Sequence, residues 1–173
     1  MKNILATLVT VFSLVLAAQA ADKTVKLSKV HLCCGKCVKG VEAATAKVSG
    51  VTATIDKDAG TVDLSGKDAA TVQKAVDAIV GAGYFATSSD ASIKVASHHG
   101  AKDAKVQSVK VTGVHLCCDK CVKAAAGAVG TVAGVKGNTA TKGADEFEVT
   151  GDFNAKDVFA ALEKAGFSGK AGK

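Results

Sequence analysis

Six cysteines, which are all the cysteines of this chain of 173 residues, lie in two copies of one ten-residue segment. Residues 30–39 return as residues 114–123, and nine of the ten positions are identical; only Gly35 and Asp119 differ. Each copy holds three cysteines within five residues, two of them in a CxxC pair. Because thiolates are soft ligands, this repeated segment predicts a site for a soft metal ion.

The CxxC pairs are Cys34 with Cys37 and Cys118 with Cys121. Each pair is expected at the start of a helix, where the helix dipole lowers the thiol pKa and favours the metal-binding thiolate. We therefore expect these four cysteines to be metal ligands. Two thiolates suit Cu(I), the first candidate, and Hg(II) by the same softness. Zn(II) stays possible, although it prefers four ligands, which one motif does not clearly offer.

Other residues of the repeat are possible additional ligands. Cys33 and Cys117 precede the CxxC pairs. They could supply a third thiolate or turn away from the metal, because adjacent side chains point in divergent directions. His31 and His115 could be ligands, partners of ligands, or polar residues at a strand end. The sequence leaves these alternatives open.

Two other interpretations of the cysteines remain. One is a thiol–disulfide oxidoreductase, because thioredoxin-like enzymes also place CxxC at a helix start. Those enzymes carry a cis-proline opposite the cysteines, however, and this chain contains no proline. The other is a structural protein with permanent disulfides. Three cysteines within five residues could close only very small loops, which hardly restrict the unfolded chain.

The elements that must position the repeats follow in the same order in both halves. Asp68 and Asn154 are expected N-caps of the second helix of each half. In the first half, hydrophobic spacing predicts strands over residues 24–30, 51–56, 61–64 and 84–85, with helices over 36–48 and 69–80. In the second half it predicts strands over 109–114, 134–141 and 146–150, helices over 119–132 and after Asn154, and a poorly defined last strand.

This order predicts an α+β protein with two tandem ferredoxin-like βαββαβ domains, each a four-stranded antiparallel sheet with two helices on one face. We place a signal peptide at residues 1–20, the first domain at 21–87, a mostly flexible linker at 88–106 and the second domain at 107–173. The signal has Lys2, an apolar run and a small-residue cleavage pattern ending at Ala20, although an uncleaved anchor is the alternative. His98 and His99 in the linker are expected to face solvent.

Charge and composition argue against several functions. The formal net charge is +6, but the positive residues are lysines without a single arginine, and aromatic residues make up 4% of the chain. Nucleic-acid recognition usually relies on arginine, so no nucleic-acid partner is expected. Beyond the N-terminal segment no stretch is long and apolar enough to cross a membrane, so no membrane association is expected after signal cleavage.

At the level of these motifs the chain resembles two tandem heavy-metal-associated domains, the fold of copper chaperones and of the periplasmic mercuric-ion binding protein. The family has a Gly-Met-x-Cys-x-x-Cys loop between the first strand and first helix. The resemblance implies that Cys34, Cys37, Cys118 and Cys121 bind the metal. Tyr84 and Phe167 match an aromatic position near that loop in some members. Departures from the pattern are Leu32 and Leu116 for methionine, Cys33 and Cys117 for a threonine, serine or histidine, and His31 and His115 for glycine.

The resemblance implies an exported metal-binding protein, periplasmic or secreted, that acts as a carrier, chaperone or buffer and is not an enzyme. Cu(I) is the first expectation, and Hg(II) or Zn(II) are alternatives. The partner would be a metal-donating or metal-accepting protein such as a transporter domain. Transfer would proceed by ligand exchange through shared three-coordinate species. If the linker lets the domains meet, one ion could lie between both motifs.

Overall fold

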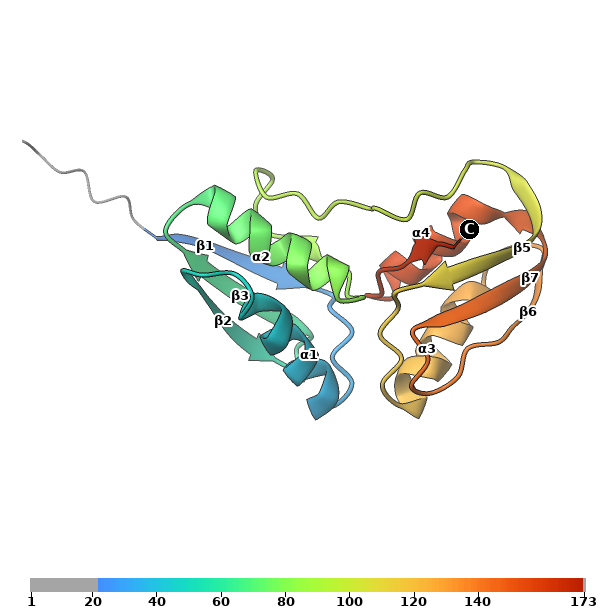
Figure 1. Cartoon of the computed structure of the whole chain (residues 1–173), viewed down its shortest axis with the longest axis horizontal. Coiled ribbons are helices and arrows are strands. Elements are labelled where there is room, and N and C mark those ends of the chain that lie inside the picture. Colours follow the sequence, from blue (N-terminus) through green and yellow to red (C-terminus); the bar gives the residue numbers. More distant parts are fainter. Residues whose placement is uncertain (1–21, 173) are drawn as a thin grey trace, which may run out of the picture.

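The computed structural model describes residues 22–172 as two α+β domains joined by one connection (Figure 1). The expected signal peptide lies outside the described residues. The first domain consists of β1 (Lys23–Ser28), α1 (Gly35–Thr45), β2 (Val51–Asp56), β3 (Thr61–Gly66), α2 (Ala69–Gly81) and β4 (Thr87–Ser88). The second consists of β5 (Lys105–Thr112), α3 (Asp119–Gly130), β6 (Val135–Asn138), β7 (Glu146–Asn154), α4 (Ala155–Lys164) and β8 (Lys170–Ala171).

Each domain is a four-stranded antiparallel sheet with two helices, which confirms the predicted fold class. The strand order is β2-β3-β1-β4 in the first sheet and β6-β7-β5-β8 in the second. Alternating residues of the central strands, such as Leu27 and Leu64, are buried against helical residues such as Ile79. The cysteine loop leaves the central strand of each sheet (β1 or β5), so its position is fixed by the best-packed part of the domain.

Local signals set the helix boundaries. The carboxylate of Asp68 accepts a hydrogen bond from the Thr71 amide at 2.7 Å, and the Asn154 side chain accepts one from the Lys156 amide at 3.0 Å, so both predicted caps are confirmed. Helix α1 ends at Thr45, earlier than predicted. The chain tightens there into a three-residue turn, in which the Val48 amide donates to the Thr45 carbonyl at 2.9 Å.

Two strands differ from the prediction. Strand β7 continues to Asn154 instead of ending at residue 150, because Gly151, with a φ of 148°, accommodates irregular pairing at this point. The last strand of the first domain is β4, not residues 84–85. Tyr84 instead forms an isolated antiparallel bridge with Phe167 of the second domain. The prediction failed there because the pairing partner belongs to the other half of the chain.

The two domains meet through equivalent segments that follow α2 and α4. The Phe85 amide donates to the Gly166 carbonyl at 2.9 Å, and the Ser168 amide donates to the Gly83 carbonyl at 2.9 Å. In Figure 1 the helices lie in front of the first sheet, whereas strands β5 and β7 lie in front of α3. The contact therefore has approximate two-fold character.

The connection, residues 89–104, contains no helix or strand but contacts both domains. Ile93 is buried, and the Gln73 side chain of α2 bonds both the amide and the carbonyl of Lys94. The ring of His99 stacks on Phe159 with centroids 4.8 Å apart. This segment is docked, unlike the mostly flexible linker expected from its polar composition, and His99 is packed rather than solvated.

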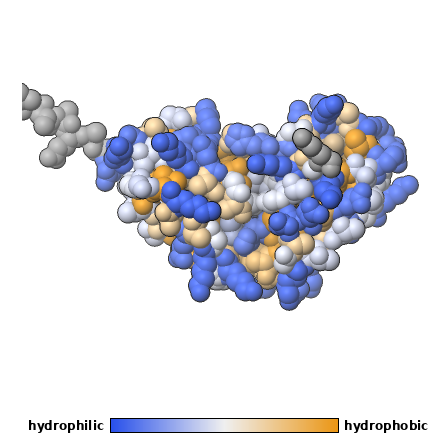
Figure 2. All heavy atoms as spheres, viewed as in Figure 1, coloured by the Kyte–Doolittle hydropathy of each residue, from blue (hydrophilic) through white to orange (hydrophobic). Residues whose placement is uncertain are grey.

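The surface drawn in Figure 2 is mainly hydrophilic on its outer parts, and the two halves touch along the middle of the molecule. Within residues 22–172, no helix is long and apolar enough to span a membrane.

Candidate metal site at the domain interface

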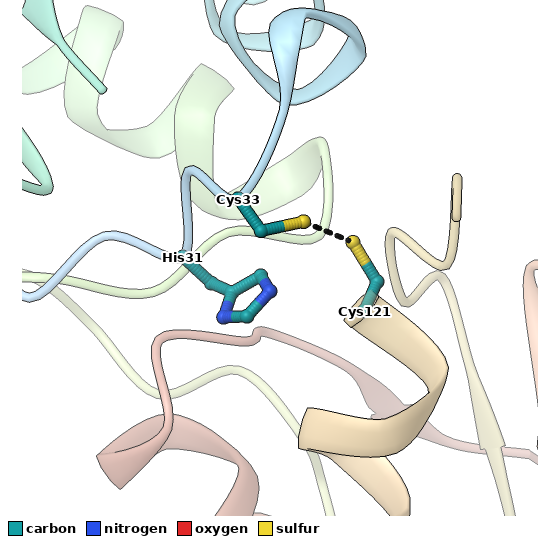
Figure 3. A group of neighbouring side chains, drawn as sticks. All are labelled: His31, Cys33 and Cys121. Carbon is teal, nitrogen blue, oxygen red and sulfur yellow. Dashed lines mark hydrogen bonds between the residues drawn. The ribbon is translucent and has the colours of Figure 1, made fainter. Parts of the chain in front are cut away.

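The two cysteine loops face each other across the domain contact. Cys34 is the N-cap of α1 and Cys118 is the N-cap of α3; both have extended backbone conformations. Cys37 and Cys121, one turn further along, are fully buried. Figure 3 shows Cys33, on the loop that leads to α1, pointing toward Cys121 on α3 of the other domain.

Aromatic contacts hold the loops in this position. The ring of Phe167 packs on His31 of the other domain with centroids 4.3 Å apart, and Tyr84 packs on His115 at 4.7 Å. The Tyr84 hydroxyl also donates to the Cys37 carbonyl at 3.0 Å. The interface residues thus connect directly to the start of the repeat in the opposite domain.

This arrangement brings the sulfurs of all six cysteines into one group, which we call the thiol cluster. Across the interface, the Sγ atom of Cys33 lies 3.3 Å from those of both Cys118 and Cys121. The Sγ atom of Cys117 lies 3.7 Å from that of Cys34 and 3.6 Å from that of Cys37. All six cysteines are free thiols. The members of the thiol cluster are Cys33, Cys34, Cys37, Cys117, Cys118 and Cys121.

The environment separates the thiols into two kinds. A hydrogen bond from the Cys37 amide lowers the pKa of Cys34 to about 6, and the Cys121 amide likewise lowers the pKa of Cys118. Burial raises the pKa of Cys33 to about 12 and also raises that of Cys117. The helix N-termini therefore favour one thiolate each, while Cys33 and Cys117 stay protonated without a cation to offset their charge.

The two histidines of the repeat lie at the domain interface, and His31 borders the thiol cluster. Their Nε2 atoms are buried, and neither has a hydrogen-bond partner among the described residues. A ring nitrogen of His31 and the sulfurs of Cys33 and Cys121 all lie within 4.8 Å of one another (Figure 3). Burial lowers the pKa of both imidazoles, which favours the neutral form. Neutral imidazoles that lack a partner are available to a ligand.

The thiol cluster is open to solvent on one side. A depression of about 520 Å³ is lined there by Cys34, Cys117 and Cys118. Its rim carries three lysines, Lys36, Lys39 and Lys142. The site therefore has an accessible mouth with positive charge, whereas Cys37 and Cys121 form its closed end.

The repeat was visible in the sequence, whereas a site shared by both copies was predicted only on the condition that the linker lets the domains meet. Each CxxC pair lies at a helix start, as predicted. The structure adds Cys33 and Cys117 to the same group as the CxxC pairs and places His31 beside it. The residues that join the domains, Gly83 and Gly166 with the aromatics after them, were not recognised as interface residues. The sequence feature that could have identified them is the glycine followed by an aromatic residue after the second helix of both halves.

Comparisons with known proteins add the following. No protein-family model matches the chain, and no curated protein does. Among solved structures, the N-terminal soluble domains of Bacillus subtilis CopA align over 88% of this chain and 95% of that chain, with 14% identity and a TM-score of 0.31. The first two RRM domains of yeast poly(U) binding protein Pub1 align over 87% and 98%, with 10% identity and a TM-score of 0.24.

Likeness at this level carries no argument about function, so the chemistry must come from the site. Sulfur ligands select soft cations such as Cu(I), and a buried imidazole suits many transition metals. A group of six free thiols with the imidazole of His31 beside it is therefore a candidate soft-metal site.

Proposed function

We propose that this protein is a soft-metal carrier or buffer that holds Cu(I) through thiolates at its domain interface. The observation that carries the proposal is the convergence of six free thiols from two domains. Free thiols at 3.3–3.8 Å from one another, with Cys37 and Cys121 buried, satisfy no structural need that alanine or valine would not satisfy. Binding of a soft cation accounts for this arrangement, because the cation compensates the charge of closely spaced thiolates.

Transfer would use the open side of the site. An incoming thiolate can approach through the depression lined by Cys34 and Cys118, whose lowered pKa values favour the thiolate form. Exchange through a shared three-coordinate ion makes and breaks only metal–sulfur bonds. The partner is a metal-donating or metal-accepting protein, and the lysine rim fits an acidic surface on that partner. No substrate bond is changed, so the proposed activity is not enzymatic.

The first experiment is an anaerobic titration of the reduced protein with Cu(I) against a competing chelator. We expect the wild type to compete for Cu(I), and the Cys34→Ser/Cys118→Ser variant to bind at least about tenfold more weakly, which corresponds to about 1.4 kcal/mol. Lys74→Gln/Lys156→Gln is the matched control, since it removes two exposed lysines of the second helices, away from the depression, and keeps every sulfur. Failure of the wild type to compete would refute the copper proposal. Parallel titrations with Hg(II) and Zn(II) rank the alternatives.

A thiol–disulfide oxidoreductase is the second candidate, because the pKa of Cys34, lowered to about 6 by the Cys37 amide, is typical of an attacking thiol. Turnover of a disulfide substrate by the metal-free protein, with an easily reduced Cys34–Cys37 disulfide, would favour it. Absence of turnover together with Cu(I) competition would favour the carrier.

Export to the periplasm or outside the cell is also part of the proposal, and it rests on residues 1–20 of the sequence. The mass of the mature protein from a cell fraction would test it. A mature chain that begins after Ala20 supports export, and a cytosolic chain that keeps Lys2 contradicts it.

A further inference from the structure

The sulfurs of the thiol cluster have a regular arrangement. Neighbouring sulfurs are 3.3–3.8 Å apart. Three further pairs lie within 4.8 Å, namely Cys33–Cys34, Cys34–Cys118 and Cys117–Cys118. Among the six described sulfurs, the pairs that remain are Cys33–Cys117, Cys34–Cys121 and Cys37–Cys118. Each sulfur thus has one sulfur opposite it and all the others beside it, which is the arrangement of the corners of an octahedron.

This geometry discriminates between coordination numbers. With a metal–sulfur bond of about 2.3 Å, sulfurs round a three-coordinate ion lie about 4.0 Å apart, and those of a linear two-coordinate ion about 4.6 Å apart. The observed separations across the interface, 3.3–3.8 Å, are shorter than both values and nearer the three-coordinate one. A tetrahedral ZnS₄ site needs four mutually adjacent sulfurs, and any four corners of an octahedron include an opposite pair. The thiol cluster is therefore suited to three-coordinate ions.

An octahedron has alternate triangular faces that share corners but no edges. One such set is formed by three groups of converging ligands together with the face Cys33–Cys37–Cys121, whose sulfur separations are 3.7, 3.3 and 3.8 Å. The three groups are Cys33–Cys34–Cys118, Cys34–Cys37–Cys117 and Cys117–Cys118–Cys121. Every cysteine belongs to two faces of this set, so every thiolate can bridge two ions.

We infer that the thiol cluster binds about four Cu(I) ions as one polynuclear centre with bridging thiolates, instead of one ion per CxxC pair. The inference rests on the proposed function and specifies its capacity. Four Cu(I) ions bound by six thiolates give a product with two negative charges, and every thiol that is protonated beforehand, up to six, releases its proton to solvent. No electron is transferred, and no oxidant is required.

Two features outside the sulfurs fit such a centre. The buried ring of His31 borders the edge between Cys33 and Cys121, where its unpartnered nitrogen can contact a bound ion or its sulfurs. The lysines at the mouth of the depression, Lys36, Lys39 and Lys142, lie where they offset the residual negative charge. Both features lie at the interface, which explains why one half of the chain alone would not complete the centre.

The test is loading of the full reduced chain with Cu(I) under anaerobic conditions, followed by metal analysis, X-ray absorption and luminescence. We expect about four Cu(I) per chain, a short Cu–Cu scattering path and the emission of solvent-shielded Cu(I)–thiolate clusters. Proton release, followed with a pH indicator, should not exceed about 1.5 protons per ion, the limit for six thiols shared by four ions. Cys33→Ser/Cys117→Ser keeps both CxxC pairs and should bind about two ions without a Cu–Cu path. Lys74→Gln/Lys156→Gln is again the matched control and should load as the wild type does.

The possible failures are distinguishable. A wild type that competes for Cu(I) but stops at about two ions, or that shows no Cu–Cu path at full loading, overturns the polynuclear centre and leaves the carrier function intact. A wild type that does not compete for Cu(I) at all overturns both. The inference is also overturned if the wild type and Cys33→Ser/Cys117→Ser bind the same number of Cu(I) ions per chain, because Cys33 and Cys117 would then not be ligands.

Discussion

The hydroxyl group of Tyr84 occupies the space in which a β-carbon on Gly40 would lie. The hydroxyl donates to the Cys37 carbonyl, so Gly40 in α1 allows the aromatic ring to reach the helix that carries the CxxC pair. At the equivalent positions of the second domain, Ala124 and Phe167 stand in place of Gly40 and Tyr84. The second domain thus has a methyl group at the helix position where the first has none, and its aromatic ring lacks the hydroxyl group.

This pairing predicts that Gly40→Ala is destabilising. A glycine-to-alanine change inside a helix normally stabilises by about 0.5–1 kcal/mol, but overlap with Tyr84 should reverse the sign and lower the free energy of unfolding by about 1 kcal/mol. Tyr84→Phe in the same chain removes the overlapping atom and should restore most of the loss. Denaturant unfolding of the four chains in a double-mutant cycle measures the coupling, and additive effects would contradict the pairing.

Gly166→Val should open the domain interface. Gly166 has a φ of 84°, and a β-carbon there would lie 2.5 Å from the Lys29 carbonyl oxygen and 2.7 Å from the His31 amide nitrogen. We expect small-angle scattering to show a larger radius of gyration and Cu(I) loading to fall. Gly127→Ala is the control, because a β-carbon at Gly127 meets no atom within 4 Å. An unchanged scattering curve for Gly166→Val would show that the domains do not meet through this segment.

The thiols should differ in reactivity with pH. The Cys37 amide lowers the pKa of Cys34 to about 6, so its thiolate persists to lower pH and its alkylation should rise as the pH passes about 6. Burial raises the pKa of Cys33 to about 12, so this neighbour should stay unreactive well above neutral pH. Peptide mass spectrometry of the reduced, metal-free protein after brief iodoacetamide treatment measures both. If Cys34 and Cys33 were instead alkylated together as the pH passed the ordinary thiol pKa of about 8.5, this difference would be contradicted.

Gln73→Ala should release the connection from the first domain without unfolding either domain. The Gln73 side chain donates to the Lys94 carbonyl at 2.7 Å and accepts from the Lys94 amide at 2.8 Å. Loss of two hydrogen bonds, each with a net contribution of about 1 kcal/mol, should speed amide exchange in residues 89–104. Lys74→Ala, one position further along α2, is the control. Exchange that stays as slow as in the wild type would mean that other contacts dock this segment.

The order of the elements could be predicted because each domain follows local rules. Alternation in residues 51–56 matched β2, and the caps at Asp68 and Asn154 lie where their side chains can accept amide hydrogens. The CxxC pairs were predicted at helix starts for the same local reason. The periodicity of the sequence predicts these elements because they are determined by residues that are close together along the chain.

A site shared by both motifs could be named only as a possibility, since the way the domains meet depends on contacts between segments more than eighty residues apart. Tyr84 pairs with Phe167, and no spacing rule connects the two halves. Cys33 could be seen as a possible ligand, but its nearest sulfurs belong to Cys118 and Cys121 of the other domain. A two-fold contact between repeats leaves only an indirect signal, the matched glycine and aromatic residues after the second helix of each half.

The contact between the halves has a consequence for the protein at high concentration. The first domain of one chain can pair with the second domain of another copy through the same bridge, because nothing in the bridge distinguishes the two cases. The docked connection gives the intramolecular pairing an effective concentration on the order of millimolar. Below that concentration the single chain completes its own site, and above it domain exchange yields dimers in which each site is shared by two copies.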